Sequence, residues 1–522
     1  MKKMFEGKKR WLVAVVAVLV LALVGVGSFA AVSTLTGKST TTNGGDGTFV
    51  TTRTDLDALP TDYKEVRPED LFTDGNAANQ MNPMTGGADE AAEAMRTAIL
   101  STKDNLSISG TKYYVSTSGS TNNDGKSEKY PIPISQVNTL SLKSGDAVLF
   151  ERGGVFRITD PIKAVSGVTY GAYGEGDKPC IYGSPQNFAD PSKWKPTNKA
   201  NVWKLNTGNY MDIGSVIFNH GQAVGIKMPS GLDQLKKTGD FYHNDTNQFI
   251  YLYCAEGNPG NVYKDIEFAV KGSIFILDVG KSDITFDNLC LKYIGEFGIN
   301  GVGANNDITV TNCEMGYIGG TKLSLTVRYG NAIQFWSTCQ RVTVENCWFY
   351  QVFDVAVTFQ GDDDNVTYSD ISFSNNLFEY NDMDIEMWNK PGAATIQNIT
   401  MNDNIMRFNS YGWGTRIEDA GNRGGAANFK IDFSNASSTY SNITVKNNIM
   451  DCSRYTAVYW LGSSRNSATI SGNSIYALSN REVGTAMMRY EDNQQLMATD
   501  QSSLETAFKT FDKNSNTIQW ID

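Results

Sequence analysis

DITFDNLCL, residues 283–291, is the first of a series of similar stretches in the second half of the chain. The later copies are DITVTNCEM (from 307), RVTVENCWF (341), DISFSNNLF (370), NITMNDNIM (398), NITVKNNIM (442) and a weaker ATISGNSIY (468). Each copy alternates β-branched with polar residues, and no copy has the 3.6-residue period of a helix. Repetition at intervals of roughly 20–50 residues predicts a solenoid, because so small a unit buries its apolar face only against its neighbours.

These repeats resemble those of the right-handed parallel β-helix proteins of the pectate-lyase-like superfamily, most strongly across 280–480. The resemblance extends back through 112–157, where a short helical piece near 132–140 would cover the open edge of the first coil. GVTYGAYGEGDKPCIYGS (167–184) would then be the first regular coil. The resemblance implies an all-β chain of coils that share three parallel sheets, with no separate domain between them.

Asn residues recur where each repeat turns, and they suit a ladder in which side-chain amides bond to their equivalents in the coils above and below. The expected ladder consists of Asn312, Asn346, Asn375, Asn404 and Asn447. Three of the seven Cys residues lie beside these positions, namely Cys290, Cys313 and Cys347. We interpret them as small buried core residues.

The chain divides into five expected segments. They are a signal peptide or signal anchor (1–32), a flexible spacer (33–86), a short helix and lead-in (87–110), the parallel β-helix (111–480) and a C-terminal cap (481–522). Basic residues precede an apolar run that begins at Trp11, which is the pattern of an export signal. Cleavage after Ala30 and retention as a membrane anchor both stay open. We therefore expect a secreted protein, or one held on the outer face of the cytoplasmic membrane, and a monomer.

The composition excludes several classes of function. A net charge of -11 disfavours nucleic acid as a partner, since a phosphate-binding groove needs basic residues. His220 and His243 are the two histidines, and the chain has no closely spaced Cys/His motif for zinc and little support for a Ser-His-Asp triad. No cofactor or metal is expected, although the oxygen-rich turn GDDDN (361–365) would suit Ca²⁺.

Three stretches align as one strand of successive coils: NAIQFW (331–336), VAVTFQ (355–360) and MDIEMW (383–388), with YGWGTR (411–416) expected to follow. Because alternate side chains of a strand face opposite ways, one set points into the coil. The expected inward residues are Ile333, Val357, Ile385, Phe335, Phe359 and Met387. Glu386 then faces outward, with Gly414 beside it and Arg416 beside Trp388.

The outward face of this strand predicts a sugar-binding site, since aromatic rings stack on sugar rings while polar groups bind the hydroxyls. The candidate substrate-binding residues are Trp336, Trp388, Gln334, Gln360, Thr358, Arg416 and Trp413. Glycoside hydrolysis needs two carboxylates, and the candidates are Glu386 as general acid with Asp354, Asp382, Asp384 or Asp363. Retaining and inverting mechanisms both stay open.

Two other functions stay open as well. One is a polysaccharide lyase or epimerase, for which the resemblance implies an Arg or Lys base (Arg416, Lys390 or Arg328) with Ca²⁺ held by 362–364. The other is a non-catalytic glycan-binding surface protein, for which the Trp residues suffice. In each case the partner is an oligo- or polysaccharide. The segments 317–330 and 417–440 interrupt the repeats, and we expect both to form walls beside the strand of Trp336 and Trp388.

Overall fold

The computed structural model describes 84–104, 106–324, 327–390, 392–415, 427–432, 435–454, 456–461, 468–478, 487–489, 495–509 and 516–521. The expected export segment and nearly all of the expected spacer lie outside these residues. No helix within the described ranges is long and apolar enough to cross a membrane.

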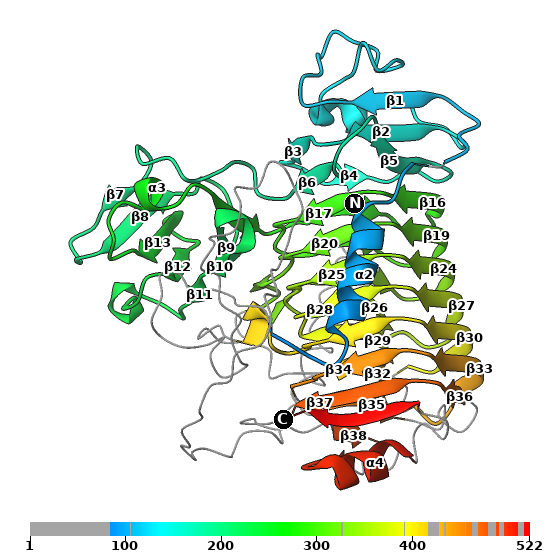
Figure 1. Ribbon diagram of the computed structural model, residues 1–522. Coiled ribbons are helices and arrows are strands. Elements are labelled where there is room, and N and C mark those ends of the chain that lie inside the picture. The colour runs from blue at the N-terminus through cyan, green and yellow to red at the C-terminus, as the bar shows by residue number, and fades with distance from the viewer. Residues whose placement is uncertain are drawn as a thin grey trace, which may run out of the picture.

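Three long sheets wind around one core and form a right-handed parallel β-helix, as the repeats predict (Figure 1). The first sheet contains β1 (Lys112–Val115), β2 (Ala147–Glu151), β5 (Thr169–Tyr173), β16 (Ser282–Asp287), β19 (Asn305–Thr311), β24 (Cys339–Glu345), β27 (Val366–Ser374), β30 (Ala394–Asn402), β33 (Thr439–Lys446) and β36 (Ala468–Ser471). The second contains β3 (Val155–Arg157), β6 (Cys180–Tyr182), β17 (Cys290–Lys292), β20 (Glu314–Gly316), β25 (Trp348–Tyr350), β28 (Leu377–Glu379), β31 (Ile405–Arg407), β34 (Ile449–Asp451), β37 (Ser474–Leu478) and β40 (Thr517–Ile521).

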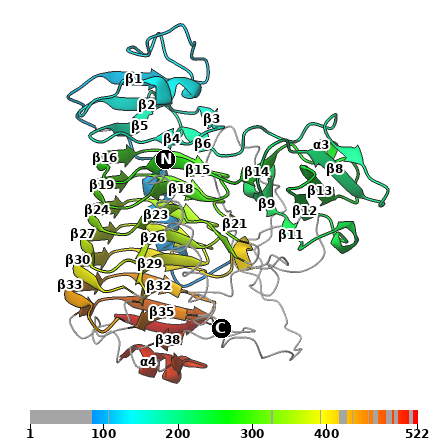
Figure 2. The ribbon, with the colours of Figure 1, turned by 180° about the vertical axis from the view of Figure 1, so that it is seen from behind.

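The third sheet contains β4 (Ile162–Lys163), β15 (Ser273–Leu277), β18 (Phe297–Gly301), β23 (Ile333–Trp336), β26 (Val355–Gly361), β29 (Met383–Asn389), β32 (Ala427–Asp432), β35 (Thr456–Leu461), β38 (Met487–Arg489) and the antiparallel β39 (Gln495–Met497) (Figure 2). The inward side chains that the alternation predicts are confirmed, because all six are at most 1% exposed. Phe335 stacks on Phe359 with ring centroids 5.1 Å apart. The core is therefore a set of columns along the helix axis.

The Asn ladder exists, but four of the five predicted residues are not in its buried column. Asn312, Asn346, Asn375 and Asn447 have positive φ values, between 52° and 55°, and form the step of the turn itself. Asn tolerates that conformation better than most residues. The buried column lies one residue later and contains Cys313, Cys347, Asn376, Asn404, Asn448 and Asn473. Cys313 and Cys347 are thus core residues, as predicted.

Replacing Asn404 with Ala should lower the free energy of unfolding by about 1–3 kcal/mol. The Asn404 amide donates to Asn448 Oδ1 (2.9 Å) and to the Phe373 carbonyl (3.0 Å), and its oxygen accepts from Asn376. The substitution removes these three buried hydrogen bonds. Urea denaturation measures the loss, with Thr395→Ala as the control, because Thr395 is an exposed residue of β30 in the same coil. Equal midpoints for both variants would contradict the ladder's role.

Helices cover the ends and one side of the coil. The 3₁₀ helix η2 (Ile134–Thr139) buries Val137 against the first coils, which confirms the helical piece predicted there. α4 (Gln501–Lys509) packs Leu504 and Phe508 into the core at the other end. α2 (Asp89–Leu100) confirms the predicted N-terminal helix and lies lengthwise along the second sheet (Figure 1).

Three segments leave the regular coils, and all three leave at the corner between the second and third sheets. They are 183–272, 317–332 and 408–426, of which 416–426 lies outside the described residues. The second contains the hairpin of β21 (Thr321–Lys322) and β22 (Arg328–Tyr329), in the range where the repeats predict an interruption. The prediction that 417–440 leaves the coil is wrong for 427–432, because these residues form the strand β32 of the third sheet.

The segment 183–272 forms a lobe of its own, so the expectation of an uninterrupted coil is wrong. One antiparallel sheet contains β9 (Ile213–Phe218), β10 (Ala223–Val224) and β14 (Ile266–Val270). The other contains β7 (Lys195–Pro196), β8 (Val202–Asn206), β11 (Ile226–Lys227), β12 (Asp240–Asn244) and β13 (Phe249–Tyr253), with β11 parallel to β12. Short helices η3 (Asn219–Gly221), η4 (Leu232–Gln234) and α3 (Pro259–Val262) join them. The lobe has a separate apolar core, which includes Phe188 and Trp194.

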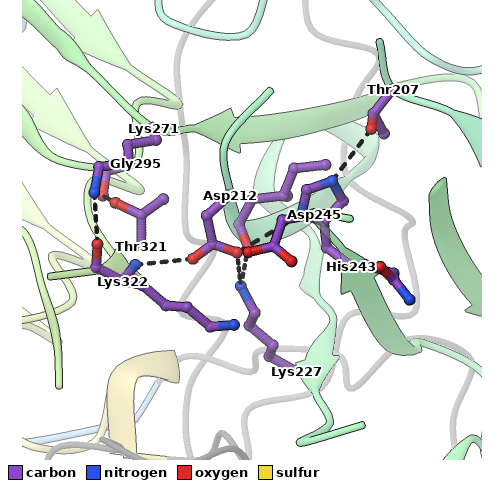
Figure 3. Close-up of polar contacts among 12 residues, drawn as sticks. Thr207, Asp212, Lys227, His243, Asp245, Lys271, Gly295, Thr321 and Lys322 are labelled. Carbon is purple, nitrogen blue, oxygen red and sulfur yellow. Dashed lines mark hydrogen bonds and ion pairs between the residues drawn. The ribbon is translucent and has the colours of Figure 1, made fainter. Parts of the chain in front are cut away.

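A buried ionic cluster fastens this lobe to the coil (Figure 3). Asp212, which is 3% exposed, accepts hydrogen bonds from Lys227 (2.8 Å), from Arg328 (2.9 Å) and from the Lys322 backbone (2.8 Å). Burial alone would raise the pKa of Asp212, but Lys227, His243 and Arg328 hold it well below its usual range. Since Lys322 and Arg328 belong to the hairpin β21–β22, the cluster joins the lobe to a different coil.

Candidate active site

Four acidic residues gather where the third-sheet strands β26 and β29 begin, at the corner that the excursions leave. Val355 pairs with Met383, so Asp354 and Asp382, the residues just before them, lie in neighbouring coils. Asp384 and Glu386 follow on the outer face of β29, since Ile385 and Met387 point inward. All four carboxyl groups are largely buried, with exposed fractions between 0% for Asp384 and 8% for Asp354.

Glu386 is held by two hydrogen-bond donors. Thr358 Oγ1 donates to its Oε2 (2.9 Å) and Lys430 Nζ donates to its Oε1 (2.7 Å). A carboxylate paired with a lysine suits a base or a nucleophile better than the predicted general acid. Burial lowers the pKa of Lys430, but the Glu386 and Asp432 carboxylates outweigh it and leave that pKa raised.

Asp382 and Asp384 lie in surroundings that favour the protonated carboxyl group. Burial raises the pKa of Asp384 to about 8, although the Asn428 and Asn381 amides donate to its two oxygens at 3.0 and 3.1 Å. Burial also raises the pKa of Asp382 to about 7. Its Oδ1 has no hydrogen-bond partner among the described residues. Both carboxyl groups thus hold their protons to a higher pH than an ordinary Asp, and Asp382 has an oxygen that is not hydrogen-bonded to a described neighbour.

One strand therefore carries two carboxyl groups with raised pKa values and a third that is paired with a lysine. Carboxyl groups whose environments favour different protonation states are the pattern of a general acid and its partner base. Two residues along a strand span about 6.6 Å, and neighbouring coils lie about 4.8 Å apart. The spacing thus allows several pairs within reach of one glycosidic bond.

The buried Asp384 carboxyl should make stability depend on pH. Its pKa is about 8 in the folded chain against 3.8 for the ordinary group, so between these values the folded state binds a proton that the unfolded state lacks. The free energy of unfolding should therefore fall as pH rises from about 4 to about 8. Urea midpoints at pH 5 and pH 8 measure this fall, which should be smaller in Asp384→Asn. An equal fall in parent and variant would show that Asp384 does not titrate in this range.

The aromatic residues lie toward the far end of the same strands. Trp336 pairs with Gln360, which pairs with Trp388, and both Trp side chains are partly exposed as predicted. Gln360 donates to Gln334 (2.9 Å), so the predicted amides form a row between the rings. The hairpin β21–β22 leaves at the opposite, carboxylate end of these strands, which differs from the predicted wall beside the Trp residues.

Thr358 is the neighbour of Glu386 in the preceding coil, as predicted, but the neighbours predicted in the following coil are wrong. The fourth aligned strand is 427–432, not 411–416, and it places Lys430 beside Glu386 and Asp432 beside Trp388. Gly414 lies against Phe353 instead, and Trp413, 2% exposed, donates from its indole nitrogen to the Gln351 carbonyl (2.8 Å). Trp413 is therefore a buried residue that packs against Phe353 at the corner between the second and third sheets. Arg416 lies outside the described residues.

Asp363 is separated from the other carboxylates. It is exposed in the turn after β26, where its backbone carbonyl accepts from Asn389. Asp362 in the same turn has a pKa raised by burial and by Asp363. Within the described part of the chain, no three His, Cys, Asp or Glu side chains gather as metal ligands.

Lys430, Asn381 and Asn428 are site residues that the sequence reasoning missed. The stretch ANFKID (427–432) does alternate, with Phe429 and Ile431 inward and Asn428 and Lys430 outward. That alternation is the signal that would have found two of them. The long excursion before β32 concealed it, because the spacing to the preceding repeat is not constant.

Comparisons with known proteins found likenesses among solved structures. A complex of XylC with xylose is 12% identical at a TM-score of 0.37, over 73% of this chain and 71% of that one. A GH136 lacto-N-biosidase from Eubacterium ramulus is 15% identical at a TM-score of 0.33, over 74% of this chain and 65% of that one. A rhamnogalacturonan lyase is 11% identical at a TM-score of 0.33, over 72% of this chain and 77% of that one. No protein-family model and no curated protein matches the sequence.

Proposed function

We propose that this chain is an extracytoplasmic glycoside hydrolase whose active site lies on β29 and the corner before it. The observation that carries the proposal is the cluster of buried carboxyl groups on that strand, of which two have raised pKa values and one is paired with a lysine. Asp382 is the general acid, because its pKa is about 7 and its Oδ1 is uncommitted. Glu386, paired with Lys430, is a further carboxylate of the site. Asp384 is a positioning residue, because it is fully buried and bonded to two amides.

The row of Trp336, Gln360 and Trp388 extends the site along the strands. Rings and amides of this kind take the faces and hydroxyls of sugar units next to the cleaved bond. An oligo- or polysaccharide is therefore the proposed substrate. Export by the N-terminal segment would bring the enzyme to such polymers outside the cytoplasm.

Among the basic residues that the structure describes, which exclude Arg416, the contacts favour hydrolysis over a lyase reaction. A lyase base must be able to lose its proton, but the pKa of Lys430 is raised by its carboxylate neighbours. Lys390 bonds to Asp432 (3.2 Å), and Arg328 is committed to Asp212 in the cluster that holds the lobe. Each of these three cations already has a structural partner.

The test is to incubate the purified protein with oligosaccharides of defined linkage and to follow two products. Hydrolysis releases new reducing ends without ultraviolet absorbance, whereas a lyase makes an unsaturated sugar that absorbs. Unsaturated product would overturn the proposal. The anomer released then identifies the geometry of the pair: Asp354, one coil from Asp382 at about 4.8 Å, fits retention, and two carboxylates two residues apart along a strand, at about 6.6 Å, fit inversion.

A further inference from the structure

The outer sheet of the lobe carries an aromatic face that the proposed catalytic site does not use. Strand β13 alternates, so that Ile250 and Leu252 enter the lobe core while Phe249, Tyr251 and Tyr253 face the other way. This sheet stands at the side of the lobe away from the coils (Figures 1 and 2). The three rings are partly exposed, so a strand that could carry small polar residues presents aromatic surface instead.

The neighbouring strands add to this face. Tyr242 of β12 is opposite Tyr251, and the two rings are nearly parallel, at 13°, with centroids 6.2 Å apart. Phe249 lies 6.2 Å from Tyr251 on its other side. The row therefore runs across two strands, and we call Tyr242, Phe249, Tyr251 and Tyr253 the lobe platform.

Polar groups accompany the rings of the lobe platform. Asn247 donates to the Tyr251 hydroxyl (3.2 Å) and Asn201 to the Tyr253 hydroxyl (3.1 Å). The Lys204 ammonium lies 5.0 Å from the centre of the Phe249 ring. The hydroxyls and amides are thus held in place beside the rings, which remain partly exposed although Lys204 lies over Phe249 and Tyr242 stacks on Tyr251.

We infer that the lobe platform is a second, non-catalytic binding surface for a glycan chain. A sugar has an apolar ring face edged by hydroxyls, and the platform offers the complementary order of flat rings edged by fixed amides and hydroxyls. A protein partner would instead favour a desolvated apolar centre with a polar rim. Here hydrogen-bonding groups are interleaved with the rings, which favours the sugar. This inference goes beyond the proposed hydrolysis and does not depend on which carboxylate acts.

The experiment is native electrophoresis through gels that contain xylan, mixed-linkage β-glucan or polygalacturonate, beside a gel without polymer. The parent should be retarded in at least one of them. Tyr251→Ala should weaken the apparent affinity in that gel by about tenfold, which is typical of losing a central aromatic contact. Tyr242→Ala should do the same, since its ring continues the same row. Tyr130→Ala is the matched control, because Tyr130 is 51% exposed and also has a lysine over its ring, but lies in the cap region.

Three results would overturn the inference: no retardation of the parent in any polymer, equal retardation of parent and Tyr251→Ala, or concentration-dependent self-association of the parent that Tyr251→Ala abolishes. Circular dichroism and the urea midpoint establish that the variants are folded. Activity on short oligosaccharides should stay unchanged in Tyr251→Ala, because the lobe platform lies away from the carboxylates. If the parent hydrolyses oligosaccharides but is not retarded by any polymer, the lobe platform inference fails and the proposed hydrolysis stands. If the parent is retarded but hydrolyses nothing, the proposed hydrolysis fails and the lobe platform inference stands.

Discussion

Glu386→Gln should lower hydrolysis by about 10²–10⁴-fold, the range expected when a positioned acid or base is removed. Gln keeps the shape and still accepts a bond from Thr358, but it cannot take a proton or carry the negative charge that the Lys430 contact stabilises. The loss should appear in kcat with little change in KM, because the contacts of the Trp residues with the substrate stay in place. Steady-state kinetics on the best oligosaccharide measure it.

Two variants make this result specific. Thr358→Val removes a donor to Glu386 without removing the carboxylate, so its loss should be far smaller. Asp382→Asn should be as damaging as Glu386→Gln, and it should remove the decline in activity that the parent shows as pH rises through about 7, where its acid loses the proton. Full activity in both Glu386→Gln and Asp382→Asn would exclude hydrolysis at this strand.

Asp212→Asn should lower the free energy of unfolding by about 3–5 kcal/mol, because it leaves Lys227 and Arg328 buried without their shared counter-charge. Both cations are almost completely buried, at 2% and 1% exposed. The transition to follow is that of the lobe, whose buried Trp194 should report it by fluorescence in urea.

Asp307→Asn is the control for that measurement. Asp307 pairs with Arg341 at 2.6 Å, but both side chains of this pair are exposed, so solvent screens it. Its midpoint should stay close to that of the parent. If Asp212→Asn unfolds at the same urea concentration as this control, the lobe is held by its apolar contacts and not by the cluster.

The sequence predicts the coil well because the coil repeats. Ile333, Val357 and Ile385 occupy equivalent places, so simple alternation was enough to orient three strands and to place Glu386 outward. The same reasoning failed at 411–416, where YGWGTR looks like another strand although the chain has left the coil. It also gave no sign of the lobe, whose strands occur once each and pair mostly antiparallel.

The site was predictable in its residues but not in its electrostatics. The alternation of side chains along the strand predicts which carboxylates lie on the outer face. This prediction requires no knowledge of the contacts that each carboxylate makes. The surroundings of each carboxyl group depend largely on contacts between coils, such as Lys430 on Glu386 and the Asn428 amide on Asp384. Those partners lie up to 44 residues away in the chain, across an excursion of irregular length.

The contacts of α2 bear on how the chain reaches this structure. A solenoid ordinarily grows by local steps, each coil forming on the last. Here the backbone amides of Gly87 and Ala88 bond to the Asp451 carboxylate, 364 and 363 residues away, and Arg96 bonds to Glu379, 283 residues away. These bonds form only after the late coils exist. We therefore expect α2, although it comes first in the sequence, to dock after those coils have formed. High contact order of this kind slows folding, and once closed it ties the early and late coils into one cooperative unit that does not fray from its ends.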